Sequence, residues 1–434
     1  MIEQAFVFFI NLSGWQLLGY FWPFFMIDMV RYVLLEGVVL LQYLPQRKRK
    51  AALYAAARQQ LFREKPLVSV IVPGKNEGRY IPKLVQTLRQ QSYPFYELIV
   101  VDDGSDDATP QICRELERNG LIDCFIRNEI RGGKASAANT ALQFAKGRYI
   151  VHIDADSYME RDALETILLP FLMDADVGCV GGDVRVANYE DSFAAQIQRI
   201  EYSKSIMVGR TVASHLGILR IVSGAYGAFR RDILEAIHGW DVGPGLDGDI
   251  TLKIRKMGFK VVHEPASVCY TNVPTSYTKL AKQRYRWDKS MIRFRLRKHR
   301  DILWPSESFR SSNFITVADN LFFNLLLDIK WVIYFFQIIQ LSSGYIAFLI
   351  ILNYFFYVCA NLVQWLFSAM MLRSLNQKPM YQSIMFIPLM PIYTGTYLRL
   401  IRTFAYVMEL LHKRSYVDRW NPWKVSKIAK RNKL

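Results

Sequence analysis

Hydrophobic residues follow three different patterns along the chain. From Ala5 to Leu44 the chain is almost continuously apolar, and a basic run ends at Lys50. Between Leu67 and about Asn272, short β-rich runs alternate with amphipathic segments of helical period, and long apolar stretches return from Ile315 onward. Because such alternation is typical of a parallel sheet covered by helices, the pattern predicts an α/β domain between membrane-associated ends.

The N-terminal apolar stretch is too long for one upright crossing and short for two, because a helix crosses a bilayer in about 20 residues. We expect one long span, residues 18–44, preceded by a short interfacial piece. The basic run that follows places its end of the helix in the cytoplasm and argues against a cleaved signal peptide. At membrane depth, Asp28, Arg31 and Glu36 would face other helices or a polar path, whereas Asp28 and Arg31 could instead pair along one face.

The C-terminal apolar region predicts two clear spans, residues 315–341 and 345–371. A third stretch, residues 381–411, contains two prolines and two arginines, and a strongly basic tail follows it. A single crossing there would place the tail outside, against the positive-inside rule. We therefore expect an interfacial or broken helix, with a third span as the alternative. Several polar residues of this region could line a polymer channel or form hydrogen bonds between helices: Asn320, Asn324, Asp328 and Gln337.

Composition supports the membrane interpretation. Hydrophobic residues make up 51% of the chain, and 55 Lys and Arg against 38 Asp and Glu leave a net charge of +17. A basic surface of this kind suits anionic lipid on the cytoplasmic side and anionic substrates. The long apolar segments argue against a nucleic-acid-binding protein. The five cysteines lack Cys-x-x-Cys spacing, which indicates a reducing compartment rather than a disulfide framework.

Polar residues follow three successive apolar runs of the central domain. The first run ends before Asn76 and Glu77, the second ends in Asp102 and Asp103, and the third ends in Asp154-Ala-Asp156. Parallel strands present their carboxyl ends at one edge of a sheet, where open α/β sheets bind ligands. Two carboxylates one residue apart can share Mg²⁺ or Mn²⁺, which commonly brings a diphosphate, although an ordinary Asp-rich turn is the alternative.

Four ordered motifs together resemble the family-2 inverting glycosyltransferases. They are the strand with Asn76-Glu77, Ile-Val-Val-Asp102-Asp103-Gly-Ser, Arg131-Gly-Gly-Lys134 through Asn139, and Asp154-Ala-Asp156. The resemblance covers about half of the chain and implies a GT-A-like, Rossmann-type nucleotide-sugar domain. It implies that Asp102 or Asp103 contacts the uridine, that Lys134 supports the nucleotide, and that Asp154 and Asp156 hold the metal on the diphosphate. Without the flanking motifs, Lys134 would be interpreted as a solvated loop charge.

Two later segments extend the resemblance within the α/β domain. The glycine-punctuated Ser223-Gly224-Ala225 loop lies where related enzymes admit the acceptor sugar, although a tight turn without a ligand is equally compatible. Related enzymes usually have Glu-Asp-x-Asp at a helix start, with the first Asp as the general base. Asp247 matches that Asp, while Leu246 replaces the Glu. Asp249 would orient Asp247 or cap the helix.

An amphipathic stretch, residues 275–299, combines a basic and an aromatic face and suits the cytoplasmic membrane surface. It contains Gln283-Arg-Tyr-Arg286-Trp287, which resembles the Gln-x-x-Arg-Trp marker of cellulose, chitin and hyaluronan synthases. By that resemblance Gln283 belongs to the substrate site, Arg286 binds the diphosphate and Trp287 stacks under the acceptor sugar. Guanidinium and indole groups suit these tasks, while a lipid anchor is the alternative.

The sequence therefore predicts five segments: an N-terminal transmembrane segment 1–50, a cytoplasmic glycosyltransferase domain 51–272, interfacial helices 273–312, a C-terminal transmembrane region 313–411 and a basic cytoplasmic tail 412–434. We expect an inner-membrane processive polysaccharide synthase that transfers UDP-glucose or UDP-N-acetylglucosamine units, with inversion, to a β-linked polymer and exports it. A non-processive transferase acting on a lipid or protein, and an inactive nucleotide-binding scaffold, are the alternatives. Membrane lipid is an expected partner, accessory secretion proteins are possible partners, and nucleic acid is not expected.

Overall fold

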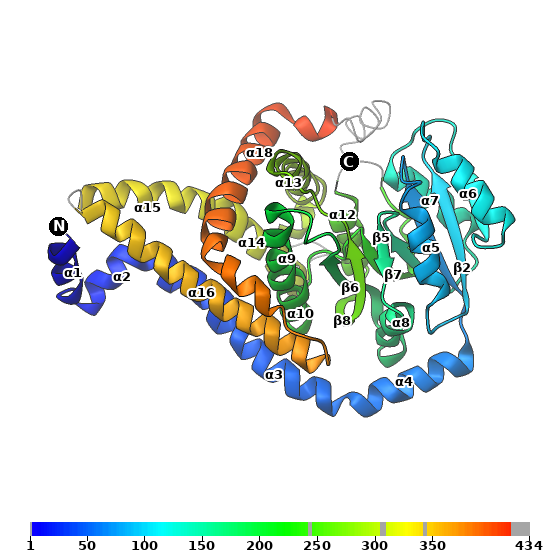
Figure 1. Ribbon diagram of the computed structural model, residues 1–434, viewed down its shortest axis with the longest axis horizontal. Helices are drawn as coiled ribbons and strands as arrows, with labels where there is room; N and C mark the ends of the chain where they lie inside the picture. Colours follow the sequence, from blue (N-terminus) through cyan, green and yellow to red (C-terminus); the bar gives the residue numbers. More distant parts are fainter. Residues whose placement is uncertain (1, 242–244, 304–309, 342–344, 418–434) are drawn as a thin grey trace.

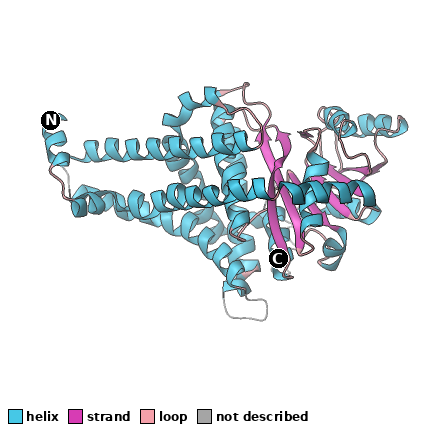
Figure 2. Ribbon diagram, turned by 90° about the horizontal axis from the view of Figure 1, so that it is seen from below, coloured by secondary structure: helices cyan, strands magenta, loops and turns pink. Residues whose placement is uncertain are grey.

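The computed structural model describes residues 2–241, 245–303, 310–341 and 345–417. A sheet domain lies at one end of the molecule and long helices extend from it at the other (Figures 1 and 2). Most of the predicted basic tail, residues 418–434, lies outside the described residues.

One mixed sheet of eight strands forms the centre of the α/β domain, in the order β3-β2-β1-β4-β7-β6-β8-β5. The strands are β1 (Val68–Gly74), β2 (Tyr96–Asp102), β3 (Cys124–Arg127), β4 (Tyr149–Ile153), β5 (Ser157–Met159), β6 (Val177–Val186), β7 (Tyr226–Arg230) and β8 (Lys260–Thr271). Strands β1 to β4 run parallel, as expected, and β6 pairs with β8 in parallel. The expectation of a parallel sheet is wrong for β7, which runs antiparallel to both β4 and β6, and for β5 against β8.

Helices cover both faces of the sheet because successive residues of a strand point to opposite sides. Val70 and Val72 of β1 pack in one core with α5 and α8, whereas Ile71 packs in a second core with α7, α11 and α12. The helices of this domain are α5 (Ile81–Arg89), α6 (Thr109–Arg118), α7 (Lys134–Phe144), α8 (Ala163–Met173), α9 (Phe193–Tyr202), η3 (Ser203–Val208), α10 (Gly209–His215), α11 (Arg231–Ala236) and α12 (Leu246–Lys256).

The chain enters this domain through a nearly unbroken series of helices and leaves it through another. The first series is α1 (Ile2–Ile10), α2 (Gly14–Trp22), η1 (Pro23–Asp28), η2 (Val30–Leu35), α3 (Glu36–Arg49) and α4 (Ala51–Glu64). The second is α13 (Tyr277–Ile292), η4 (Arg293–Lys298), η5 (Arg300–Leu303), α14 (Ser311–Leu321), η6 (Phe322–Leu326), α15 (Leu327–Leu341), α16 (Ile346–Ser374), η8 (Tyr381–Leu389), α17 (Met390–Ile392), η9 (Tyr393–Tyr397), α18 (Leu398–His412) and η10 (Arg414–Val417). The predicted amphipathic stretch thus forms α13 and η4.

Within the described residues, three helical segments are long and apolar enough to cross a membrane: Ser311–Gln340, Ile346–Ser374 and Tyr381–His412. The last one, expected to be interfacial or broken, contains 3₁₀ and π turns yet has the length and apolarity of the alternative, a third span. The predicted span 18–44 is not among these segments, although its helices lie alongside α16 (Figure 1). The number of crossings stays a prediction.

Polar residues of the long helices are paired across helices. The carboxylate of Asp28 accepts hydrogen bonds from Tyr357 and, at 3.3 Å, from the Lys330 ammonium, so it faces other helices. Arg31 likewise reaches Asp319 of α14, with Nε 3.5 Å from Oδ1. Hydrogen bonds between helices also account for the candidate channel residues: Arg402 donates to Asn324 and Asp328, and Trp22 donates to Gln337, while the side chain of Asn320 lies outside the described residues.

Candidate active site

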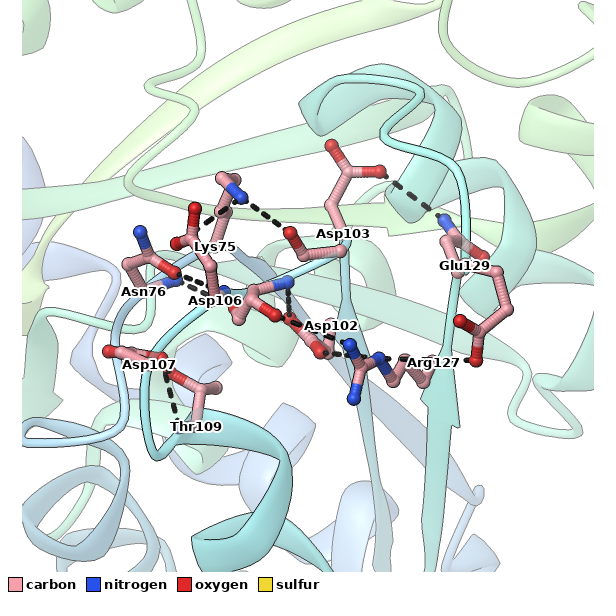
Figure 3. Close-up of polar contacts among 12 residues, drawn as sticks. Lys75, Asn76, Asp102, Asp103, Asp106, Asp107, Thr109, Arg127 and Glu129 are labelled. Carbon is pink, nitrogen blue, oxygen red and sulfur yellow. Dashed lines mark hydrogen bonds and ion pairs between the residues drawn. The ribbon is translucent and has the colours of Figure 1, made fainter.

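The loops after β1 and β2 are held together at the carboxyl edge of the sheet (Figure 3). The Asn76 backbone N–H donates to Ser105 Oγ at 2.8 Å, and the Asp106 backbone N–H donates to Asn76 Oδ1 at 3.0 Å. Asn76 adopts a left-handed backbone with φ 61°, a conformation that Asn tolerates better than most residues. The two predicted loops therefore form one surface.

Asp102 and Asp103 are both buried and both engaged by protein groups. Oδ1 of Asp102 accepts from the Ser105 N–H at 3.0 Å, and its Oδ2 lies 3.7 Å from Arg127 Nε. Asp103 accepts from the backbone N–H groups of Gly132 and Gly133 at 2.8 and 2.7 Å. Asp103 thereby fixes the glycine loop that precedes Lys134, the first residue of α7.

A short chain of polar contacts joins the predicted metal site to the predicted base. Lys134 Nζ bonds to the carboxylate of Asp154 and donates to the Gly224 carbonyl oxygen at 3.0 Å. On the other side of the same loop, the Gly224 N–H donates to Asp247 Oδ2 at 2.9 Å. The Asp154 N–H, in turn, donates to the Ala225 carbonyl oxygen at 3.1 Å. Residues from β4, α7, α12 and the loop before β7 therefore meet at one point.

The carboxylates around Asp154 carry more negative charge than Lys134 balances. Burial, and then the neighbouring charge of Asp154, raise the pKa of Asp156 to about 6. Burial, and then the charges of Asp156 and Asp154, raise the pKa of Glu77 to about 7. Such crowding of carboxylates fits a divalent cation, which would lower the repulsion among them.

Asp154 and Asp156 are the residues that would hold Mg²⁺ or Mn²⁺. The described residues contain no group of three His, Cys, Asp or Glu side chains placed to hold an ion by themselves. Magnesium is commonly bound by one or two carboxylates that share the ion with substrate phosphates. Asp156 is held by Asn272, whose side-chain amide donates to the Asp156 carbonyl oxygen at 3.2 Å.

Asp247 lies in the first turn of α12. The residue before this helix, Gly245, has a left-handed backbone conformation with φ 90°. A side chain at Gly224 would place its Cβ 2.9 Å from Asp247 Oδ1. Only glycine therefore allows the loop to approach the carboxylate this closely. Ser223 completes the turn, because its Oγ accepts from the Ala225 N–H at 3.3 Å.

Asp249 neither contacts Asp247 through the described bonds of its carboxylate nor caps the helix, the two roles predicted for it; its carboxylate bonds to other residues. Its Oδ2 lies 2.7 Å from Lys298 Nζ, and its Oδ1 lies 2.7 Å from His299 Nε2. The N-terminal cap of α12 is Gly245, so Asp249 does not occupy the cap position. The carboxylate instead joins α12 to the end of η4, and sequence spacing gave no signal for this contact across 50 residues.

The Gln-x-x-Arg-Trp segment lies on α13, which packs against α18 (Figure 1). The Trp287 side chain is 42% exposed, and the Arg284 guanidinium lies 4.7 Å from the centre of its ring. The Gln283 Oε1 is buried without a hydrogen bond among the described residues. The substrate roles of Gln283, Arg286 and Trp287 stay predictions.

Glu201 of α9 forms contacts between segments that the sequence motifs did not indicate. Its Oε2 accepts from Arg284 at 2.8 Å and from the Tyr393 hydroxyl at 2.7 Å. It thus links the sheet domain, α13 and the last apolar segment. No motif of the sequence singled out Glu201, because its two partners lie far from it along the chain.

The sheet domain is similar to known proteins. Residues 69–237 match the model of the glycosyl transferase family 2. Poly-β-1,6-N-acetyl-D-glucosamine synthases are similar to the chain: one from Staphylococcus epidermidis is 29% identical over 51% of this chain and 53% of its own length. Another from the same species is 27% identical over 61% and 62%. The chain thus spans between about half and three fifths of the length of these relatives.

A solved structure shares the fold. The mannosyltransferase PcManGT from Pyrobaculum calidifontis, in complex with GDP-Man and Mn²⁺, superposes with a TM-score of 0.54 and 23% identity, covering 87% of this chain and 99% of that one. The sheet domain therefore has a GT-A-like fold, and residues 69–237 within it match the model of the glycosyl transferase family 2. The same chain has apolar helices of membrane-spanning length.

Proposed function

We propose that this protein is a membrane-embedded, processive polysaccharide synthase that uses UDP-glucose or UDP-N-acetylglucosamine. The observation that carries the proposal is the backbone of Gly224: its N–H donates to Asp247 and its carbonyl oxygen accepts from Lys134, which also bonds to Asp154. Gly224 therefore lies between the proposed proton acceptor and the proposed diphosphate site, an arrangement that supports a displacement at a sugar carbon.

In the proposed reaction the acceptor hydroxyl oxygen bonds to C1 of the donor sugar as the bond from C1 to the UDP oxygen breaks. Asp247 takes the hydroxyl proton on the face opposite the leaving group, so the configuration at C1 inverts. Lys134 lies beside Asp154 and suits the charge of the departing UDP. A divalent ion bound at Asp154 and Asp156 would add charge neutralisation on the diphosphate.

Processive synthesis requires that the growing chain stay bound near Asp247 between transfers. The half-exposed Trp287 indole suits a pyranose face, and Arg286 suits a phosphate. The cytoplasmic orientation of the sheet domain rests on the basic residues that precede α4. Membrane lipid would surround the long helices, through which we expect the polymer to leave.

Polymer synthesis by the purified protein tests this proposal. The full chain in nanodiscs would receive Mn²⁺ and radiolabelled UDP-glucose or UDP-N-acetylglucosamine, and the products would be sized and digested with linkage-specific glycosidases. We expect long, β-glycosidase-sensitive chains from the unaltered protein and none from Asp247→Asn, which keeps its UDP affinity. Single-sugar products on lipid would instead identify a non-processive transferase, and UDP binding without turnover would identify a scaffold.

A further inference from the structure

One face of α12 holds the loop before β7 at three points. Asp247, Thr251 and Arg255 follow one another at intervals of four residues, so their side chains lie on the same face of the helix. Each of them bonds to the backbone of residues 217–224, which we call the acceptor loop because it contains Ser223-Gly224. The helix that carries the proposed base therefore also carries the supports of the loop beside it.

Thr251 forms the middle support. Its Oγ1 accepts from the Val222 N–H at 3.0 Å and donates to the Asp247 carbonyl oxygen at 2.6 Å. The Val222 N–H is buried, and a buried N–H that loses its acceptor costs free energy. One hydroxyl group thus links the backbone of the proposed base to the acceptor loop.

Arg255 forms the third support and connects it to the long helices. Its Nη2 donates to the Gly217 carbonyl oxygen at 2.9 Å, and its Nε donates to Asn313 Oδ1 at 2.9 Å. Asn313 lies on α14, within the apolar segment Ser311–Gln340. The acceptor loop is thereby fixed both to α12 and to a segment of membrane-spanning length.

The acceptor loop is accessible beside the base and buried at its middle support. Ser223, Gly224 and Asp247 are partly exposed, whereas Val222 and Thr251 are 1% and 0% exposed. A sugar hydroxyl can therefore approach Asp247 along the exposed part of the loop. Because Thr251 is shielded from solvent, it acts on the acceptor through the loop and not by contact.

We propose that Thr251 is a positioning residue for sugar transfer, which fixes the acceptor loop so that the acceptor hydroxyl, and not water, lies beside Asp247. The inference rests on the proposed function, because it concerns the acceptor of the same site. A loop held at both Val222 and Gly224 keeps a fixed direction as well as a fixed distance to the base. Such orientation of an attacking group contributes strongly to the rate.

Water is the competitor that this positioning excludes. In hydrolysis the water oxygen bonds to C1 of the donor sugar, the bond from C1 to the UDP oxygen breaks, and Asp247 takes the water proton. The products are free sugar and UDP. Water needs no orientation by the acceptor loop, so a loosened loop slows transfer more than hydrolysis.

A simpler role for Thr251 is an intrahelical hydrogen bond alone, because threonine hydroxyls in helices often donate to the carbonyl oxygen four residues earlier. Thr211 of α10 forms such a bond to the Met207 carbonyl oxygen, also at 2.6 Å, and is 1% exposed. Thr211→Val is therefore the matched control for Thr251→Val. It removes the same kind of intrahelical bond, while the Val222 N–H keeps Thr251 as its acceptor.

Initial rates of the full chain in nanodiscs test the inference, with Mn²⁺ and radiolabelled UDP-glucose or UDP-N-acetylglucosamine. Polymer-bound sugar and free sugar are counted separately. Thr251→Val should lower kcat for transfer by about tenfold or more and raise the ratio of free to polymer-bound sugar, with UDP affinity unchanged. Thr251→Ser keeps the hydroxyl group and should behave as the unaltered protein does, as should Thr211→Val. Equal falls in transfer and hydrolysis, or the same loss in Thr211→Val, would overturn the inference.

Hydrogen–deuterium exchange measures the support of the loop independently of activity. The peptide that covers residues 217–224 should exchange faster in Thr251→Val than in Thr251→Ser or the unaltered protein, because its anchor is lost. Equal exchange in the three proteins would overturn the inference. Absence of transfer by the unaltered protein, with exchange in the expected order, would instead count against the proposed function.

Discussion

The Gly224 N–H lies 2.9 Å from Asp247 Oδ2, and this contact leaves no room for a side chain. One peptide group therefore sets both the direction and the distance of the proposed base relative to the loop that would receive the acceptor.

Gly224→Ala is expected to lower kcat by about 100-fold, since displacing a catalytic group by about 1 Å commonly has that effect. The affinity for UDP should stay unchanged, because the methyl group meets Asp247 and not the nucleotide loops. Gly181→Ala is the matched control, as the nearest atoms to its Cβ are those of Val222 at an ordinary 3.7 Å. Radiometric initial rates and UDP titrations measure both effects; an unchanged kcat in Gly224→Ala would contradict the role of Asp247.

The sheet edge could be predicted from sequence because each strand changes from apolar to polar residues within two positions. Asn76, Asp102 and Asp154 stand at such changes, and the structure brings their loops together. The position of β7 could not be predicted, because an antiparallel strand between β4 and β6 depends on pairing partners distant in sequence. The local hydrophobic pattern indicates where a strand forms but not which distant strand it pairs with.

The residues of the candidate site were easier to predict from the sequence than the hydrogen bonds and ion pairs among them. Lys134 and Asp154 were both expected to lie on the diphosphate, and the structure joins them directly. The partners of Asp249 could not be found, because Lys298 and His299 belong to a run of basic residues that resembles a membrane-facing surface. Burial of two members of a basic run is a tertiary property, and the charge pattern alone does not distinguish it from exposure.

Lys134→Met is expected to have opposite effects on the two parts of the donor site. UDP affinity should fall by about tenfold or more, because a charge-assisted hydrogen bond is lost. Mn²⁺ alone should bind more tightly, because the ammonium beside Asp154 no longer repels it. Isothermal titration of each ligand measures the two changes. A Lys134→Arg variant keeps the charge and serves as the control; weaker Mn²⁺ binding in Lys134→Met would argue against a metal at Asp154.

The affinity for Mn²⁺ is expected to depend on pH through Asp156. Its carboxyl group, with a pKa raised by burial and by Asp154 to about 6, must lose its proton before it can bind the ion. Affinity should therefore rise by about tenfold per pH unit below that value and level off above it. In Asp154→Asn the midpoint should move to lower pH, although binding weakens overall. Electron paramagnetic resonance of free Mn²⁺ follows the titration, and a flat profile between pH 5 and 7 would refute the assignment of Asp156.

Asp249→Asn is expected to destabilise the protein by about 3 kcal/mol, because it removes the buried charge beside His299 and Lys298 and leaves Lys298 with Asp241 as its ion-pair partner. Burial alone would raise the pKa of Asp249, but the hydrogen bond from His299 and the charge of Lys298 hold it well below the usual range. A lowered folded pKa gives stability that is present above pH of about 4 and is lost as the pH falls further. Unfolding in guanidinium chloride at several pH values measures this, with the exposed Glu235→Gln, worth about 0.5 kcal/mol or less, as the control. Equal losses in the two variants would contradict the predicted buried network.

Glu201→Gln is expected to shorten the polymer. The Glu201 carboxylate accepts hydrogen bonds from Arg284, the second residue of the Gln-x-x-Arg-Trp segment, and from Tyr393 of the last apolar segment. An amide cannot hold both groups with the same strength, and loss of a hydrogen bond to a charged group shifts a docking equilibrium by about tenfold.

Looser docking of α13 should release the chain more often between transfers, so that mean chain length falls while the rate of the first transfer changes little. Tyr393→Phe removes one of the two hydrogen bonds and should give an intermediate length. Size-exclusion chromatography of radiolabelled product and a single-turnover assay separate the two quantities. The probability of retaining the polymer compounds over successive transfers, so a change in retention alone shortens the chain and leaves the first transfer unaffected. If the first-transfer rate fell by the same factor as the chain length, Glu201 would act on the chemical step rather than on retention.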